Sequence, residues 1–231
     1  MAVAHPNVTL IAHTALTQDA IDVFGNEEHY LFHDDVEDAD ALAEVAGRSC
    51  YRAYGRKNPD TAKNDGYLAH IIDQAHNSVL EHASATFYLT GVSRSLLAEL
   101  TRHRHLSFSV QSQRYVNESK SACVIPPVMR DDPDAVKALS DWQDAVNSVY
   151  ENMVLDLSSK GVARKQAREA ARALMPNMTE TRIVVTGSMA AYRYVLSRRL
   201  DPSADAEIRE VAGMILAELK KVAPNSFADF D

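Results

Sequence analysis

The chain has 231 residues, of which 46% are hydrophobic and 24% charged, as expected of a globular protein with a substantial core. Its formal net charge of −8 argues against a general binder of nucleic acid or of anionic membranes, but not against a local basic pocket for a small anion. The cysteines Cys50 and Cys123 show no metal or redox spacing, so we expect a reducing, cytoplasmic setting. Neither a signal peptide nor an apolar run of the roughly 18 residues that span a bilayer is found.

The first third of the chain is predicted to contain one strand and two helices. The expected elements are a first or edge strand at 8–13, an acidic surface loop at 25–40, an amphipathic helix at 37–54, a turn at 58–60 and a helix from Asn64 to Ala75. Asn64 is expected to cap that second helix through its side chain.

The rest of the chain is predicted to be mostly helical with two clear strands. The expected elements are a strand at 84–93, a helix to about His103, a loop or strand at 107–114, helices at 133–158 and 162–174, a strand at 181–187, and helices at 189–199 and 204–222. Few strands separated by helices indicate an α+β fold, which we expect to be a single domain over residues 1–231. A small, mostly antiparallel sheet is expected to be flanked by the helices.

The most informative segment runs from Arg102 to Arg114 and holds three arginines, two histidines and three serines in thirteen residues. Guanidinium groups are permanently charged forks that suit phosphates and other planar anions. A simpler interpretation is a solvated charged face, with Glu99, Arg102 and His103 close enough on one helix to touch. The density of cations in an otherwise acidic chain favours an anion site.

A second polar segment, from His76 to His82, contains Ser78 and Glu81. Histidine and glutamate are zinc ligands, but the six-residue spacing of the two histidines does not place them on one helical face. We therefore predict no metal site here; a helix end with polar caps is the simpler interpretation.

Two further groups of arginines lie in the C-terminal half. Arg164, Arg168 and Arg172 form a stripe at helical spacing, and Arg198 and Arg199 close a predicted helix. Cations in the last turn of a helix complement its dipole, which explains such residues without any ligand.

The segment 102–114 resembles the signature Arg-His-Arg-x-x-Ser-x(4)-Ser-x-Arg of the flavin-dependent thymidylate synthases, and every fixed position is present. Further similar elements follow the family order: His76–His82, Arg172–Pro176, Thr179–Gly187 and Arg199. Several independent matches in order are more specific than one motif. The resemblance extends from about Val8 to Phe230.

The resemblance implies methylation of dUMP to dTMP, with 5,10-methylenetetrahydrofolate as the carbon donor, NADPH as the reductant and FAD as the cofactor. It also implies a homotetramer with FAD at subunit contacts and active sites built from more than one chain. The chain has no glycine-rich dinucleotide fingerprint, so the FAD pyrophosphate is expected to be held by side chains.

The resemblance also assigns roles to individual residues. Arg199 is the implied catalytic residue, which contacts the uracil ring and stabilises its N3-deprotonated form. The implied FAD contacts are Ser78, Glu81, Arg102, His103, Arg104, Ser188 and Tyr194. The implied dUMP contacts are Arg94, Glu99, Arg102, Gln111, Ser112, Gln113, Arg114, Arg172 and Arg199.

The chain departs from the usual family pattern at Val110, Ser188, Ala190 and Ser203. The last three replace larger polar side chains that help to hold FAD, so fewer flavin contacts are expected, with Arg193 and Tyr194 as the nearest substitutes. Two other functions stay open from the residues alone. One is a nucleotide or phosphate sensor without flavin; the other is a hydrolase using Ser112 and His103.

Overall fold

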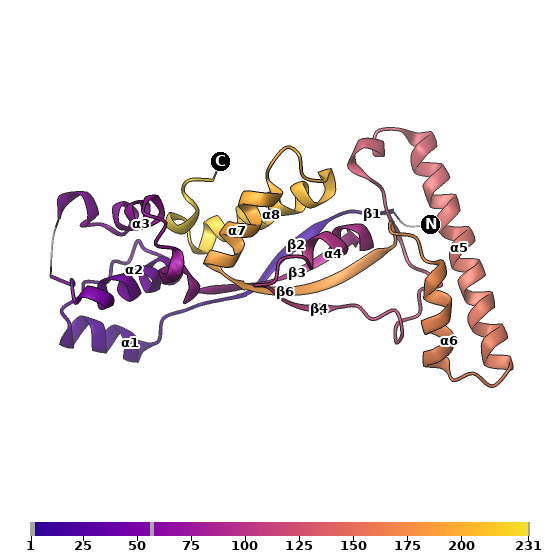
Figure 1. The fold of residues 1–231 in the computed structure, drawn as a ribbon, viewed down its shortest axis with the longest axis horizontal. Coiled ribbons are helices and arrows are strands. Elements are labelled where there is room, and N and C mark those ends of the chain that lie inside the picture. The colour runs from indigo at the N-terminus through magenta and orange to yellow at the C-terminus, as the bar shows by residue number, and fades with distance from the viewer. Residues whose placement is uncertain (1–2, 56–57, 231) are drawn as a thin grey trace.

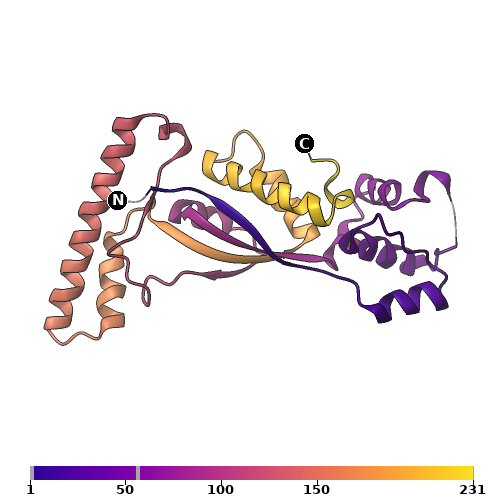
Figure 2. The same ribbon diagram turned by 180° about the vertical axis from the view of Figure 1, so that it is seen from behind.

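The computed structural model describes residues 3–55 and 58–230. A central sheet separates two helical regions, α1 to α3 at one end and the α5–α6 hairpin at the other (Figures 1 and 2). The predicted α+β fold with a small antiparallel sheet is confirmed. Within the described ranges, no helix is both long and apolar enough to cross a membrane.

The main sheet has the order β2-β3-β6-β4, and every neighbouring pair is antiparallel. Its strands are β2 (Asn7–His13), β3 (Ser84–Ser93), β6 (Glu180–Ser188) and β4 (Ser107–Val110). The three predicted strands are thus confirmed, with β2 at an edge, and the segment 107–114, predicted as loop or strand, begins as β4. A second, parallel pair joins β1 (Val3–Ala4) to β5 (Cys123–Val124).

The predicted helices lie close to their expected positions and differ mainly at their ends, whereas α1 was not predicted. The α-helices are α1 (Gln18–Asp22), α2 (Asp38–Tyr51), α3 (Asn64–Asp73), α4 (Arg94–Leu100), α5 (Pro133–Ser159), α6 (Arg164–Ala171), α7 (Met189–Arg199) and α8 (Ala206–Val222). The π-helix η1 (Val23–Glu27) and the 3₁₀ helices η2 (Pro59–Thr61), η3 (Asn77–Glu81), η4 (Pro127–Met129), η5 (Arg172–Leu174) and η6 (Asn225–Phe227) complete the chain. The predicted acidic loop is therefore partly helical, because η1 occupies its start.

The expected capping role of Asn64 is wrong. Lys63 occupies the cap position of α3, and the buried Asn64 amide donates instead to the Asp40 carbonyl and the Glu44 carboxylate in α2. A buried amide gains more from two partners across a helix contact than from a cap that water can replace. Helix α3 also ends at Asp73, two residues early, since Ala75 adopts a positive φ of 55°.

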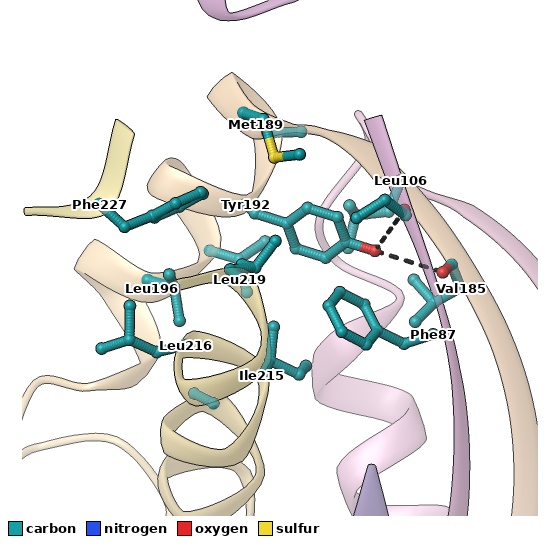
Figure 3. Close-up of a cluster of buried hydrophobic side chains, with 14 of the residues drawn as sticks. Phe87, Leu106, Val185, Met189, Tyr192, Leu196, Ile215, Leu216, Leu219 and Phe227 are labelled. Carbon is teal, nitrogen blue, oxygen red and sulfur yellow. Dashed lines mark hydrogen bonds between the residues drawn. The ribbon is translucent and has the colours of Figure 1, made fainter. Parts of the chain in front are cut away.

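The core lies between one face of the sheet and helices α4, α7 and α8, which both views place on the same side (Figures 1 and 2). Tyr192 from α7 is fully buried there. Its ring and that of Phe87 are arranged edge to face, with their centroids 5.3 Å apart (Figure 3). Its hydroxyl lies 3.2 Å from the carbonyl oxygens of Ala85 and Val185. Tyr192 therefore attaches α7 to β3 and β6 at once, with its polar group satisfied.

Gly91 lies where the register of β3 shifts against β6, and it has a positive φ of 64°. An added Cβ at this position would lie 1.8 Å from the carbonyl oxygen of His5. Gly91→Ala should therefore lower the free energy of unfolding by about 2–4 kcal/mol, through a steric clash and backbone strain together. Urea denaturation measures this loss.

Gly213→Ala is the matched control, because Gly213 is inside α8 and its Cβ would meet nothing within 4 Å. The control should raise stability by up to about 1 kcal/mol through higher helix propensity. Equal stability of Gly91→Ala and the wild type would contradict the predicted clash.

Candidate functional site

The C-terminal ends of α4 and α7 meet through Arg199. Its Nη1 donates to Oε2 of Glu99 at 2.6 Å, and its Nη2 donates to the backbone carbonyl of Glu99 at 3.0 Å. Its Nε donates to Nε2 of His103 at 2.9 Å. The Arg199 side chain is only 14% exposed, and three hydrogen bonds in this largely buried contact set its orientation.

The meeting follows from the topology. Helix α4 starts directly after β3 with Ser93 as its cap, and α7 starts directly after β6 with Ser188 as its cap. Because β3 and β6 are antiparallel, the two helices begin at opposite ends of the pair and extend toward each other over one face. Residues that are 96 positions apart, His103 and Arg199, are thereby brought into contact.

His103 is 7% exposed and accepts the Arg199 bond through Nε2, so its neutral form carries the proton on Nδ1. Burial lowers the pKa of His103, and the charges of Arg199 and Arg102 lower it further. The imidazole is therefore a neutral acceptor at physiological pH. Glu99, Arg102 and His103 lie close together as expected, since the Arg102 amide donates to the Glu99 carbonyl at 3.3 Å, but α4 ends at Leu100 and the Glu99 carboxylate pairs with Arg199.

A cleft of about 430 Å³ opens beside this contact. It is lined by Arg102, His103, Tyr194, Ser197, Arg198, Arg199, Asp201 and Ser203. Three of these side chains are cations, and Arg198 also lies 5.7 Å from the Tyr194 ring. The cleft thus offers guanidinium donors and an aromatic surface to an anionic, planar ligand.

A second cleft of about 420 Å³ adjoins the first and shares Tyr194 and Ser197 with it. Asn77, the first residue of η3, and Ala190 line it as well. The predicted flavin residues Ser78 and Glu81 are exposed on this same short helix. The structure therefore places η3 close to the first turn of α7.

Two of the residues expected to help with flavin are already engaged in this region. Ser188 caps α7 by accepting from the Ala191 backbone amide at 3.1 Å. Arg193 donates to both carboxylate oxygens of Asp229 at 2.6 and 2.7 Å and to the carbonyl of Ser226. Arg193 is therefore attached to the C-terminal segment through three bonds, while it also lines the second cleft.

The predicted dUMP residues of the signature lie in the loop after β4. Helix α6 flanks this loop: Arg168 donates to the Tyr115 carbonyl, and Arg114 lies 3.9 Å from the Glu169 carboxylate. Burial lowers the pKa of Arg94; the carboxylate of Glu118 opposes this effect, and the charge of Arg172 adds to it. The backbone amide of Arg94 donates to the Thr179 carbonyl at 3.1 Å, so the start of α4 lies beside the segment that follows η5.

The predicted site residues consequently form two groups in one chain. Arg102, His103, Tyr194 and Arg199 line the first cleft, whereas Gln111, Ser112, Gln113 and Arg114 lie in the loop beside α6. Across residues 3–55 and 58–230, no hydrogen bond or ion pair joins the two groups. Arg104 is exposed on the turn between α4 and β4 and belongs to neither cleft lining.

Several lining residues were not among the site residues predicted from the sequence. Ser197 and Arg198 follow Tyr194 at helical spacing, and that periodicity is the signal that would have identified them. Asp201 and Ser203 belong to the turn after α7, where the Ser203 hydroxyl donates to Asp201 at 2.6 Å. Ser203 was expected near FAD as a departure from the family pattern, whereas no sequence pattern marks Asp201 as part of a cleft.

A metal site and a serine nucleophile were also weighed in the sequence analysis. Within the described ranges, no group of three histidine, cysteine, aspartate or glutamate side chains is arranged to hold a metal ion. No hydrogen bond in the same part of the chain joins Ser112 to a histidine, as activation of a serine nucleophile requires.

Comparisons with known proteins agree on one family. Residues 32–225 match the family model described as thymidylate synthase complementing protein. The probable flavin-dependent thymidylate synthase of Mycobacterium phage L5 is 53% identical over 197 residues, 83% of this chain and 81% of the relative. The flavin-dependent thymidylate synthase of Mycobacterium tuberculosis H37Rv is 50% identical over 204 residues, 85% and 82% of the two chains.

A solved structure has the same fold. The crystal structure of thymidylate synthase X from Helicobacter pylori, with FAD and dUMP, superimposes with a TM-score of 0.62 and covers 96% of this chain and 99% of its own. At 18% sequence identity this likeness concerns the fold alone. The extent of the family-model match and the identity to the mycobacterial relatives show that the chain belongs to the flavin-dependent thymidylate synthase family.

Proposed function

We propose that this protein is a flavin-dependent thymidylate synthase that converts dUMP to dTMP. The carbon donor is 5,10-methylenetetrahydrofolate and the reductant is NADPH, which acts through FAD. The observation that carries the proposal is Arg199, held by Glu99 and His103 at the edge of a cation-lined cleft in a chain of this family. The whole chain, residues 1–231, is proposed to act as one domain.

The residues around the two adjoining clefts fit FAD. Arg102 and Arg198 supply fixed positive charge for a pyrophosphate, and Tyr194 supplies an aromatic face between the clefts. Side chains thus replace the glycine turn that other dinucleotide sites use. The proposed FAD contacts are Ser78, Glu81, Arg102, His103, Arg104, Ser188 and Tyr194. FAD, when bound, supplies the reducing equivalents that the methylation consumes.

We assign Arg199 the role of stabilising negative charge on the uracil ring. An arginine has five N–H donors, and three of those of Arg199 are used by Glu99 and His103. The remaining two are free for the substrate. A fixed cation beside the ring favours the N3-deprotonated form, which makes carbon 5 electron-rich enough to attack a one-carbon unit without a cysteine nucleophile.

The phosphate of dUMP is assigned to the cationic region beside α6. Arg94, Arg114 and Arg172 supply charge there, while Gln111, Ser112 and Gln113 supply neutral hydrogen bonds. Glu99 and Arg102 complete the proposed dUMP contacts near Arg199. Fixed guanidinium groups suit a dianionic phosphate because they donate in a planar fork.

A homotetramer is proposed because the two groups of site residues are separate within one chain. Two surfaces support self-association. One face of the main sheet is not covered by any helix of the described residues in either view (Figures 1 and 2), and Trp142 on α5 is 58% exposed along with Val149 and Leu155. Exposed large apolar side chains on one helix are typical of an interaction surface. Association would bring residues of neighbouring chains to one active site.

The function is tested with the purified protein and its proposed ligands. Added FAD should give a bound oxidised-flavin spectrum and raise the melting temperature, because a ligand of the native state stabilises it. With dUMP, 5,10-methylenetetrahydrofolate and NADPH, the protein should form dTMP. Binding of dUMP without flavin or turnover would indicate a nucleotide sensor and overturn the proposal.

Arg199→Ala should lower kcat for dTMP formation by about 10²–10³, because it removes the cation that stabilises charge in the transition state. FAD binding should persist. Arg209→Ala, in α8 and bonded only to the Pro202 carbonyl among the described residues, is the control and should keep wild-type kcat. Near-normal turnover of Arg199→Ala would contradict the catalytic role and leave this arginine only a structural contact between α4 and α7.

The protein should become less stable as the pH is lowered, and His103 should cause part of this loss. Its pKa is lowered from the ordinary value of 6.5, so the folded state binds fewer protons than the unfolded state, and stability is lost as the pH falls below about 6.5. His103→Asn should reduce the difference in unfolding free energy between pH 7.5 and pH 5.5.

The control for this measurement is His105→Asn, a change in an exposed side chain of the same turn. It should retain the wild-type difference between the two pH values. An unaltered pH dependence in His103→Asn would show that other groups cause the acid destabilisation.

Ala190→Arg should tighten FAD binding, since Ala190 lines the second cleft where the family usually has a larger polar side chain. One charge-assisted hydrogen bond gained corresponds to roughly tenfold in affinity. Equilibrium dialysis measures it. Ala217→Arg adds the same charge at an exposed position of α8 and should leave the FAD affinity unchanged.

A further inference from the structure

A buried carboxylate lies inside the loop that carries the signature residues Gln111 to Arg114. Glu118 is only 1% exposed although it follows a run of exposed residues. Its Oε1 accepts from the Gln111 amide at 3.4 Å, and its Oε2 accepts from the Ser121 hydroxyl. The two oxygens therefore hold the start and the end of the loop together. At this burial Glu118 is unable to touch a ligand itself.

Ser121 also attaches this loop to helix α5. The Ser121 carbonyl accepts from the side-chain amide of Asn147 in α5 at 3.0 Å. Within α5, the Gln143 amide donates to Asn147 at 2.9 Å. Thr179, just before β6, donates to Gln143 at 3.3 Å. Gln143, Asn147 and Thr179 are all buried. A continuous buried polar network is rigid because each member would pay a desolvation cost if its partner left.

Charge gives Glu118 a second effect. Burial and the charge of Arg172 lower the pKa of Arg94, and the negative charge of Glu118 opposes both effects. A buried anion near a guanidinium group favours its charged form.

We propose that Glu118 is a positioning residue for dUMP, which fixes the 111–121 loop that carries the proposed dUMP contacts. This inference rests on the proposed function of the site. It makes Glu118 act through Gln111, Ser112 and Arg114, and it requires no contact between the carboxylate and the substrate.

The test is the isosteric variant Glu118→Gln in the full-length protein with FAD. KM and Kd for dUMP should rise by about tenfold, as expected when a charge-assisted buried contact is lost. FAD affinity and kcat at saturating dUMP should stay within about threefold of the wild type, since the chemistry near Arg199 is untouched. Ser121→Ala removes one contact of the same carboxylate and should raise KM for dUMP by a smaller factor.

The control is Asp40→Asn, which removes another fully buried carboxylate that accepts from Asn225 and Ser226 far from the loop. It should lower the melting temperature and leave KM for dUMP unchanged. Wild-type dUMP affinity in both Glu118→Gln and Ser121→Ala would overturn the assignment, as would a joint loss of FAD and dUMP binding in Ser121→Ala. Absence of dUMP binding by the wild type would instead overturn the proposed function, and this inference with it.

Discussion

The antiparallel pairing of β3 with β6 is the constraint on which the candidate site depends. Helix α4 begins where β3 ends, and helix α7 begins where β6 ends. Because the strands are antiparallel, these two points lie at opposite ends of the strand pair. Their C-terminal ends therefore converge, and Tyr192 attaches α7 to both strands beneath them. The contact of Arg199 with Glu99 and His103 is a consequence of this geometry more than of any local motif.

The convergence also explains why so many arginines gather in an acidic protein. The last turn of a helix exposes carbonyl groups with partial negative charge, and two such ends meet here. Arg198 and Arg199 lie in the last turn of α7, and Arg102 follows the last turn of α4. Helix-end complementarity and ligand binding are therefore compatible explanations for the same residues, because the site is built where the fold already favours cations.

The fold was largely predictable from the sequence, and the reasons are local. Strands 84–93 and 181–187 have strong β-forming composition, and Asp132 before Pro133 marks the start of α5 unambiguously. Asn64 was assigned wrongly, because a capping residue and a buried amide bridging two helices look the same in sequence. Helix ends at Leu100 and Asp73 depend on backbone geometry that periodicity does not encode.

The candidate site was predictable only through the family resemblance. The signature identified Arg102 to Arg114, but nothing in it indicates that Arg199 bonds His103, since that contact is made by tertiary topology. Glu118 is a single glutamate in an irregular loop, and only its burial distinguishes it from the surface. Asp201 and Ser203 enter the cleft through a turn whose position is set by α7.

The separation of the site residues into two groups has a thermodynamic consequence in the proposed assembly. A nucleotide that bridges two chains contributes to the free energy of their association, and association contributes equally to the affinity for the nucleotide. Dilution and ligand depletion would therefore act in the same direction on the protein. The concentration of subunits then sets how much of the nucleotide is bound, and the supply of nucleotide sets how much of the protein is assembled.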